Sequence, residues 1–131
     1  MALVIMVDKF GEEPLFEQIR NQVVAAIATG DVRPGDALPS VRSLARDLGI
    51  NLHTVNKAYA TLRDEGFVIM LGRRGAFVAD AASRPAAGLG EDELERRLAR
   101  LATEFLASGG SREQFLAAAS RAAAAPPGAG A

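Results

Sequence analysis

Hydrophobic residues recur at steps of three and four positions in three segments of the first half of the chain. This spacing puts them on one face of a helix, so it predicts amphipathic helices over residues 14–29, 41–48 and 52–65. The apolar positions are Phe16, Ile19, Val23, Ala26 and Ile27, then Val41, Leu44, Ala45 and Leu48, then Val55, Ala58, Tyr59 and Leu62.

The residues at the ends of these segments support the same boundaries. Pro14 suits the first position of a helix, where its missing N–H costs nothing, and Gly30 suits the left-handed residue that follows a helix. Ser40 and Asn51 can each N-cap the helix that comes after them. Because Gly49 ends the second helix just before Asn51, the sequence predicts two helices joined by a tight turn, the helix-turn-helix pattern.

Short apolar runs on both sides of the helices predict extended structure. Residues 3–7 (LVIMV) favour a strand or an extended arm, because the run is short and partly β-branched. Residues 67–71 (FVIML) and 76–79 (AFVA) are separated by Gly-Arg-Arg-Gly, which fits a four-residue hairpin loop. A helix-turn-helix followed by a hairpin is a winged helix-turn-helix, so residues 1–80 are expected to form an α+β fold that is mainly α.

The composition changes after residue 80. Residues 81–90 are rich in Ala, Gly, Pro and Ser and are expected to form a linker. Residues 91–121 are expected to form a short helical dimerisation region, in which Ser111 and Gln114 can form the capping box of a second helix. Residues 122–131 contain two prolines and two glycines and are expected to form a disordered tail.

One apolar seam runs along the first helix of that region. It consists of residues at steps of four, three and four, a spacing typical of coiled coils: Leu94, Leu98, Leu101 and Phe105. The helix that follows offers only Phe115 and Leu116 as large apolar partners, so one chain cannot cover the seam alone. We therefore expect these four residues to form a homodimer contact.

Charge is distributed unevenly along the chain. The 131 residues carry a net charge of −1, which taken alone argues against a nucleic-acid partner. Residues 42–74, however, hold six basic and three acidic side chains, whereas residues 1–41 hold three basic and six acidic ones. A basic excess confined to the helix-turn-helix and hairpin can attract a polyanion to one face of the protein.

Catalytic and metal-binding chemistry finds little support. The chain has no cysteine and one histidine, His53, so it offers no thiol nucleophile, disulfide or zinc cluster. No carboxylate pair has the spacing of a general acid and base, and the Gly-Arg-Arg-Gly loop lacks the Lys-Ser/Thr ending of a phosphate-binding loop. We expect no enzyme activity, cofactor or metal, and, because the apolar start is too short for a signal peptide or membrane span, a cytoplasmic protein.

The helix-turn-helix resembles a known family closely. The resemblance to the winged-helix DNA-binding domain of GntR-family bacterial transcription regulators covers about residues 8–79, and it is carried by residues 14–19 (PLFEQI), 35–45 (GDALPSVRSLA), Gly49-Ile50, Thr54-Val55, Ala58-Tyr59, Leu62 and Glu65-Gly66. The short helical C-terminal region resembles the YtrA subfamily, whose small helical extension dimerises. The wing departs from the family's common Gly-x-Gly-Thr-Phe-Val, since Arg73-Arg74-Gly75-Ala76-Phe77-Val78 replaces the first Gly and the Thr.

Candidate DNA-binding residues come from the third helix, both caps and the hairpin. His53 and Lys57 lie opposite the apolar face of the third helix, and recognition helices insert their first turns into the major groove. Arg42 opposes the dipole of its own helix, which a phosphate or guanine would compensate, and the resemblance implies that the matching arginine contacts DNA. The predicted set is Ser40, Arg42, Asn51, His53, Thr54, Asn56, Lys57, Arg73 and Arg74.

The sequence thus predicts a transcription regulator that binds a double-stranded palindromic DNA operator as a homodimer and acts as a repressor. Ser40 and Asn51 are explained by capping alone, and the arginines and polar side chains also fit an ordinary solvated surface. The alternative is a winged-helix protein-interaction module that binds no DNA. Nothing in the residues identifies a small-molecule effector or the genes that are regulated.

Overall fold

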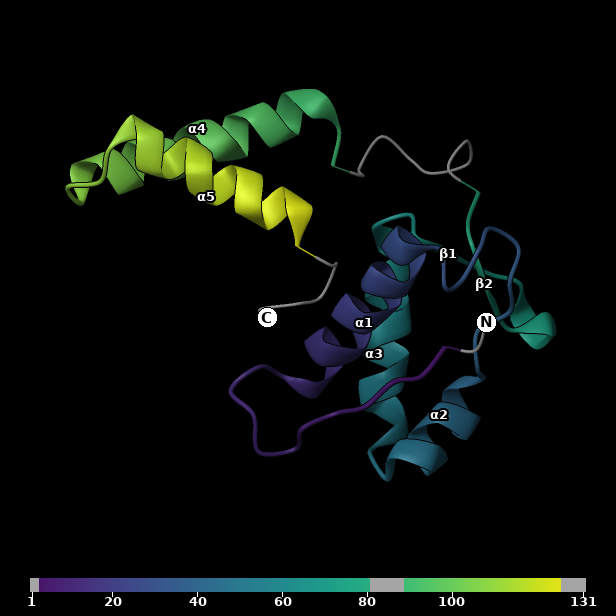
Figure 1. Ribbon diagram of the computed structural model, residues 1–131. Coiled ribbons are helices and arrows are strands. Elements are labelled where there is room, and N and C mark those ends of the chain that lie inside the picture. Colours follow the sequence, from purple (N-terminus) through teal and green to yellow (C-terminus); the bar gives the residue numbers. More distant parts are fainter. Residues whose placement is uncertain (1–2, 81–88, 126–131) are drawn as a thin grey trace. The chain divides into compact units, whose positions relative to one another are not determined.

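The computed structural model describes residues 3–80 and 89–125, which belong to two compact units, each considered by itself (Figure 1). The first unit contains three helices, α1 (Leu15–Thr29), α2 (Val41–Leu48) and α3 (Leu52–Asp64), and a hairpin. The hairpin consists of β1 (Val68–Met70), the 3-10 turn η1 (Gly72–Arg74) and β2 (Ala76–Val78). The second unit contains α4 (Glu91–Ala107) and α5 (Arg112–Ala124). This is the predicted winged helix-turn-helix followed by helices, mainly α.

The core of the first unit is built around α3. Val55, Ala58, Tyr59 and Leu62 of α3 are almost completely buried, as the periodicity of the sequence predicts. They pack with apolar residues of α1, α2 and the hairpin, namely Ile19, Val23, Leu44, Ala45, Val68, Ala76 and Val78. Because α1 and α2 both contact α3, this helix is the central element of the unit.

The helix ends follow the capping residues of the sequence with one shift. The Ser40 hydroxyl accepts a hydrogen bond from the Ser43 backbone N–H at 3.0 Å, and Gly49 ends α2 in the left-handed conformation. The Asn51 side-chain oxygen caps α3 by accepting from the His53 N–H at 2.8 Å. Pro14 stands at the N-cap of α1 instead of its first helical position, because its extended backbone (ψ 145°) lies just outside the helix.

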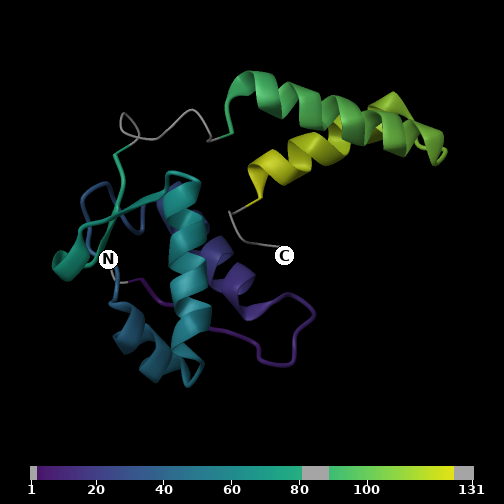
Figure 2. The same cartoon turned by 180° about the vertical axis from the view of Figure 1, so that it is seen from behind.

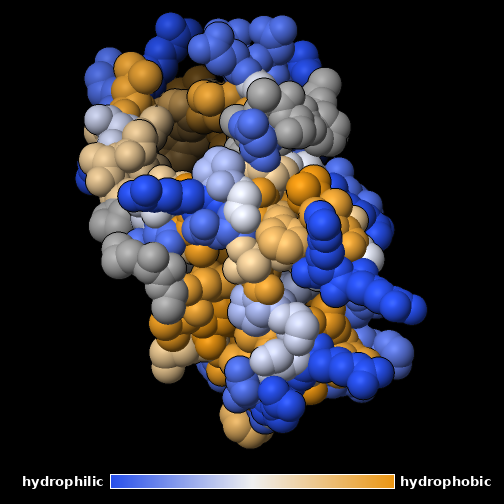
Figure 3. All heavy atoms as spheres, turned by 90° about the vertical axis from the view of Figure 1, so that its right-hand side faces the viewer, coloured by the Kyte–Doolittle hydropathy of each residue, from blue (hydrophilic) through white to orange (hydrophobic). Residues whose placement is uncertain are grey.

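The hairpin is a two-stranded antiparallel sheet that pairs Val68 with Val78, Ile69 with Phe77 and Met70 with Ala76. A third segment adds to β2, since the Leu38 N–H donates to the Ala76 carbonyl and the Val78 N–H donates to the Asp36 carbonyl, both at 2.9 Å. The free β1 side carries three exposed apolar residues, Ile69, Met70 and Leu71. Figure 3 views the molecule from the side that carries the sheet and shows apolar atoms among the hydrophilic ones there.

The N-terminal residues form an extended arm without a strand partner among the described residues. Two glutamines of α1 replace the partner: the Gln22 amide both accepts from the Met6 N–H and donates to the Met6 carbonyl, and the Gln18 amide does the same for Asp8. Within the arm, the Ile5 side chain is buried, whereas those of Val4 and Met6 are exposed. Buried and exposed side chains therefore alternate along this run as in a strand, but its backbone hydrogen bonds go to side chains of a helix.

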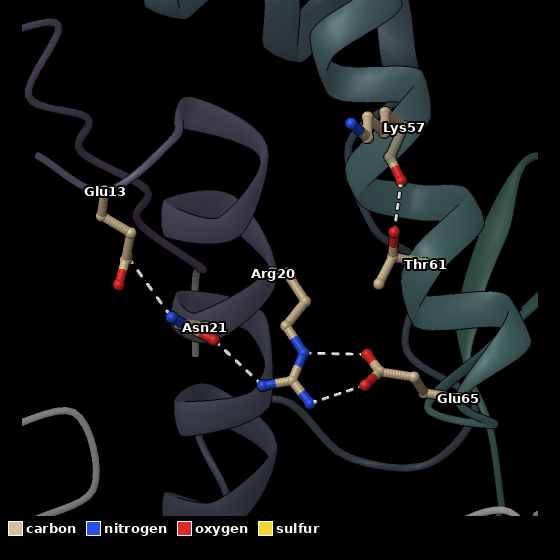
Figure 4. A network of polar contacts seen from close by, with 6 residues as sticks. All are labelled: Glu13, Arg20, Asn21, Lys57, Thr61 and Glu65. Carbon is tan, nitrogen blue, oxygen red and sulfur yellow. Dashed lines mark hydrogen bonds and ion pairs between the residues drawn. The ribbon is translucent and has the colours of Figure 1, made fainter.

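Polar contacts fix α1 and α2 to α3. The buried Tyr59 hydroxyl donates to the Pro39 carbonyl at 2.6 Å, just before the N-cap of α2. At the other side of α3, the Arg20 guanidinium forms two hydrogen bonds with the Glu65 carboxylate, at 2.8 and 3.0 Å, and its third contact is Asn21 (Figure 4). The Arg20 guanidinium also lies 5.6 Å from the centre of the Phe67 ring, so α1, the end of α3 and the start of the hairpin meet at one side chain.

The second unit is a helical hairpin with an open apolar surface. Ser111 and Gln114 form the predicted capping box of α5, and the Phe105 and Phe115 rings lie 6.2 Å apart between the helices. No residue of α4 or α5 is buried. The four seam residues Leu94, Leu98, Leu101 and Phe105 remain between 36% and 54% exposed. The seam is therefore present and uncovered within one chain.

One predicted boundary in this unit is wrong. Residues 122–131 are predicted as a disordered tail, but α5 continues through Ala124. Alanine has the highest helix propensity, so the alanines after Arg121 extend the helix until Ala125, which is extended (ψ 147°) because it precedes Pro126. The rest of the predicted tail, residues 126–131, and most of the predicted linker, residues 81–88, lie outside the described residues.

We expect Tyr59→Phe to lower the free energy of unfolding by about 1 kcal/mol at neutral pH, because the Pro39 carbonyl loses its donor. Burial raises the pKa of the Tyr59 phenol above its ordinary value of 10.0. Above that pH the unfolded chain releases the phenol proton while the native protein retains it, so stability falls as pH rises. Tyr59 is the chain's only tyrosine. Urea unfolding of both proteins at neutral pH and at pH about 10.5 tests this, since Tyr59→Phe must lose less stability on alkalisation.

Candidate nucleic-acid interface

The exposed face of α3 carries polar side chains at its N-terminal end. His53, Asn56 and Lys57 are exposed and lie away from the buried face, as the helical wheel predicts. Thr54 is half-buried, so less of its hydroxyl group is accessible than the sequence implies. The first two turns of α3 therefore present an imidazole, an amide and an ammonium group to solvent, and all three can donate hydrogen bonds.

The two capping side chains keep donors for a further partner. The Ser40 hydroxyl oxygen and the Asn51 amide oxygen are used as acceptors by backbone N–H groups. The hydroxyl hydrogen of Ser40 and the amide hydrogens of Asn51 are not used in these bonds, and both residues are exposed. Each cap can therefore also donate a hydrogen bond to an anion at the start of its helix.

The described arginines of the first unit differ in whether they have a carboxylate partner. Arg20 is paired with Glu65 and Arg63 with Asp64, so these guanidinium groups have carboxylate partners. Arg42, Arg73 and Arg74 are exposed and form no ion pair within the part of the chain that the structure describes. Arg33 and Arg46 are likewise exposed and form no ion pair with a described residue, so the lack of a carboxylate partner is shared by, but not confined to, the three arginines that the sequence assigns to DNA.

Glycine holds the two wing arginines at the tip of the hairpin. Gly72 and Gly75 flank them with φ of 57° and 93°, a region that side chains rarely adopt. The Gly75 N–H donates to the Gly72 carbonyl at 3.0 Å, which closes the turn. Gly72 thus provides the positive φ that the sequence lacks at position 73, and the turn carries both arginine side chains on its exposed surface.

Lys57 has a contact that the sequence pattern does not show. Its ammonium group lies 4.1 Å from the centre of the Phe16 ring at the start of α1, a cation–π geometry. Figure 4 shows the Lys57 side chain turned toward α1, and the Thr61 hydroxyl one turn further along donates to the Lys57 carbonyl. In the sequence, Phe16 reads only as a core position, because nothing local indicates a cation from another helix.

These contacts define the two edges of the α3 face. The Tyr59–Pro39 bond puts the N-terminal end of α2 on one side, and the Phe16–Lys57 contact puts the start of α1 on the other. Figure 2 shows the same arrangement, with α2 and the wing on one side of α3 and α1 on the other. Asn56 lies on the α2 side of the wheel and Lys57 on the α1 side.

The described residues contain no candidate metal site. Within residues 3–80 and 89–125, no three His, Asp or Glu side chains lie close enough to hold a metal ion. Apart from the Tyr59 hydroxyl group, no polar or charged side chain among the described residues is buried. A search of the described helices for one that is long and apolar enough to cross a membrane finds none.

Comparisons with known proteins agree with this geometry. Residues 15–78 match the family described as bacterial regulatory proteins, gntR family. The chain is 40% identical over 88 residues to the HTH-type transcriptional regulator Rv1152 of Mycobacterium tuberculosis, a match that covers 63% of this chain and 73% of that protein. The chain belongs to the GntR family.

Two further similarities concern YtrA proteins. This GntR-family chain is 39% identical over 79 residues to the HTH-type transcriptional repressor YtrA of Bacillus subtilis, covering 60% of this chain and 61% of that protein. The structure of YtrA from Sulfolobus acidocaldarius, a GntR-family transcription factor, is 33% identical with a TM-score of 0.55, over 92% of this chain and 97% of that one. These similarities support the YtrA-subfamily assignment.

The family identifies the class of activity. This GntR-family protein is a DNA-binding transcription regulator and not an enzyme, as the sequence predicts. The interaction module without DNA binding is therefore not the preferred interpretation.

Proposed function

We propose that the chain is a homodimeric cytoplasmic repressor that binds a palindromic operator through α3. The observation that carries this proposal is the polar N-terminal face of α3, bordered by arginines without ion-pair partners on α2 and on the wing. B-form DNA has a major groove about 12 Å wide that accepts one helix, and the phosphates on its borders attract arginines. Repression then follows from occupation of a promoter.

Each side chain has a proposed role. His53, Thr54 and Asn56 face base edges, because they lie in the first turns of the inserted helix. Arg42 binds a guanine or a phosphate from the first turn of α2, where an anion also compensates the opposed helix dipole. The remaining contacts are to the backbone or to the minor groove: Ser40, Asn51 and Lys57 bind phosphates, and Arg73 and Arg74 enter a narrow A·T-rich minor groove.

The dimer is proposed from the uncovered seam of α4. Leu94, Leu98, Leu101 and Phe105 are each more than a third exposed, and their own unit buries none of them. Burying a side chain of this size is worth about 1.5–3 kcal/mol, so a second copy that packs on the seam gains substantially. Two winged helices related by a two-fold axis also match the two half-sites of a palindrome.

We expect duplex DNA selected from random sequence by the full chain to converge on a palindrome. Binding to that site should weaken steeply with salt, because each neutralised phosphate releases counterions and adds about −0.9 to the slope of log K against log salt concentration. The measurement is a binding titration at several salt concentrations with the selected site and a scrambled duplex. A flat slope with equal affinity for both duplexes would contradict the proposal.

Arg42→Ala should weaken binding to the selected site by about 1–3 kcal/mol if the guanidinium makes a bidentate base contact. The thermal midpoint should change little, because the side chain is exposed and forms no ion pair with a described residue. Gel-shift titrations and thermal melts measure both. Arg100→Ala is the control, since it removes one exposed arginine from α4, where the pairing with Glu104 spans 3.6 Å. Equal affinity of Arg42→Ala and the parent would remove Arg42 from the interface.

Leu98→Glu should convert the dimer to a monomer and lower operator affinity toward the non-specific level, because a buried unpaired carboxylate opposes packing of the seam. Sedimentation gives the mass, and titration with the selected site gives the affinity. Thr103→Glu is the matched control, since it adds the same charge to an exposed α4 position outside the seam. A Leu98→Glu protein that remains dimeric would place the interface elsewhere.

A further inference from the structure

The arm that precedes α1 brings a cation to the turn between α2 and α3. The Lys9 ammonium group donates to the Gly49 carbonyl at 3.0 Å, across 40 positions of sequence. Gly49 is the left-handed residue that ends α2, two positions before the N-cap of α3. A lysine outside the helix-turn-helix therefore lies at the entrance of the recognition helix, and the predicted DNA-binding set does not include it.

Hydrogen bonds hold the backbone around Lys9 in place. The Asp8 carboxylate accepts from the Phe10 N–H at 3.0 Å, and the Asp8 carbonyl accepts from the Gly11 N–H at 3.2 Å, which makes a tight turn. The Gln18 amide binds both the N–H and the carbonyl of Asp8, at 2.8 and 2.9 Å, and so ties the turn to α1. Lys9 is thus held in place both by the bonds of its neighbour Asp8 to α1 and by its own bond to Gly49.

The ammonium group keeps capacity for an anion. It has three donors, and the Gly49 carbonyl uses one of them. No carboxylate among the described residues lies within ion-pair distance of Lys9. Asp8 and Asp47 line the same shallow hollow, but the Asp8 side chain is engaged in its own turn. Lys9 resembles Arg42 in this respect, since both are exposed cations without an acidic partner.

The cations around α3 indicate which part of a DNA duplex Lys9 can contact. A helix in the major groove is bordered by two sugar–phosphate backbones, one on each side. Arg42 belongs to α2, and Arg73 and Arg74 belong to the wing, on one side of α3, whereas Lys57 lies on the α1 side, over Phe16. The Lys9 ammonium group lies at the Gly49 carbonyl, where the turn between α2 and α3 begins, and the arm continues from Lys9 to the start of α1.

We propose that Lys9 is a phosphate contact beside the N-terminal end of the recognition helix, where it and Lys57 bind one sugar–phosphate backbone. The proposal rests on the DNA binding proposed above and adds a segment outside the helix-turn-helix to the interface. The Gly49 bond orders the Lys9 side chain before DNA arrives, so less side-chain entropy is lost on binding.

The test compares full-length Lys9→Met, Lys9→Arg and Phe10→Ala proteins with the parent. Lys9→Met should lower the steepness of the salt dependence by about 0.9 per subunit and weaken binding about fivefold to tenfold per contact at ~0.1 M salt. It should do so by the same factor on selected and scrambled duplexes, because phosphates carry no sequence information. Lys9→Arg should retain the parental slope. Phe10→Ala changes the neighbouring, 97% exposed side chain without changing charge and should also retain it.

Two results for Lys9→Met would overturn the proposal. The first is a salt slope equal to that of the parent. The second is a lower thermal midpoint together with a lost preference for the selected site, which would make Lys9 a cap of α2 that only positions the turn. Loss of slope in Phe10→Ala as well would attribute the effect to the turn and not to the charge. A parent protein without salt-dependent DNA binding would instead contradict the proposed function itself.

Discussion

The hydrogen bond from Tyr59 to the Pro39 carbonyl is the contact on which the rest of the helix-turn-helix depends. Tyr59 is completely buried in α3, so its hydroxyl group requires a partner, and that partner lies immediately before the N-cap of α2. One bond thus satisfies a buried donor and places the first turn of α2 beside α3. Apolar packing alone specifies this position less sharply, because it is not directional.

The charged side chains divide according to whether folding uses them. Arg20 forms an ion pair with Glu65 and a cation–π contact with the Phe67 ring, and so joins α1, the end of α3 and the start of the hairpin. Arg42 and the wing arginines have no such partners among the described residues, and the fold is complete without them. A net charge of −1 is therefore compatible with DNA binding, because the acidic side chains are concentrated elsewhere in the chain.

Features with a local cause could be predicted from the sequence. The three helices, the caps Ser40 and Asn51, the hairpin and the capping box of Ser111 all depend on residues within a few positions of one another. The contacts of Lys57 with Phe16 and of Lys9 with Gly49 join residues about 40 positions apart, and no periodicity encodes them. The extension of α5 to Ala124 does not follow from the composition of residues 122–131, because the prolines and glycines of this segment indicate disorder while its alanines favour a helix.

The glutamines of α1 hold the arm through its backbone, so these bonds do not depend on the side chains of the arm residues that they bind. In these four bonds Gln18 and Gln22 contact backbone atoms of Asp8 and Met6, so the side chains of Asp8 and Met6 take no part in them, and Gln18 also donates to the Glu13 carbonyl. A substitution at Met6 should accordingly leave these bonds and the course of the arm intact. The course of the arm is thus encoded by a pair of glutamines four positions apart in α1, outside the arm itself.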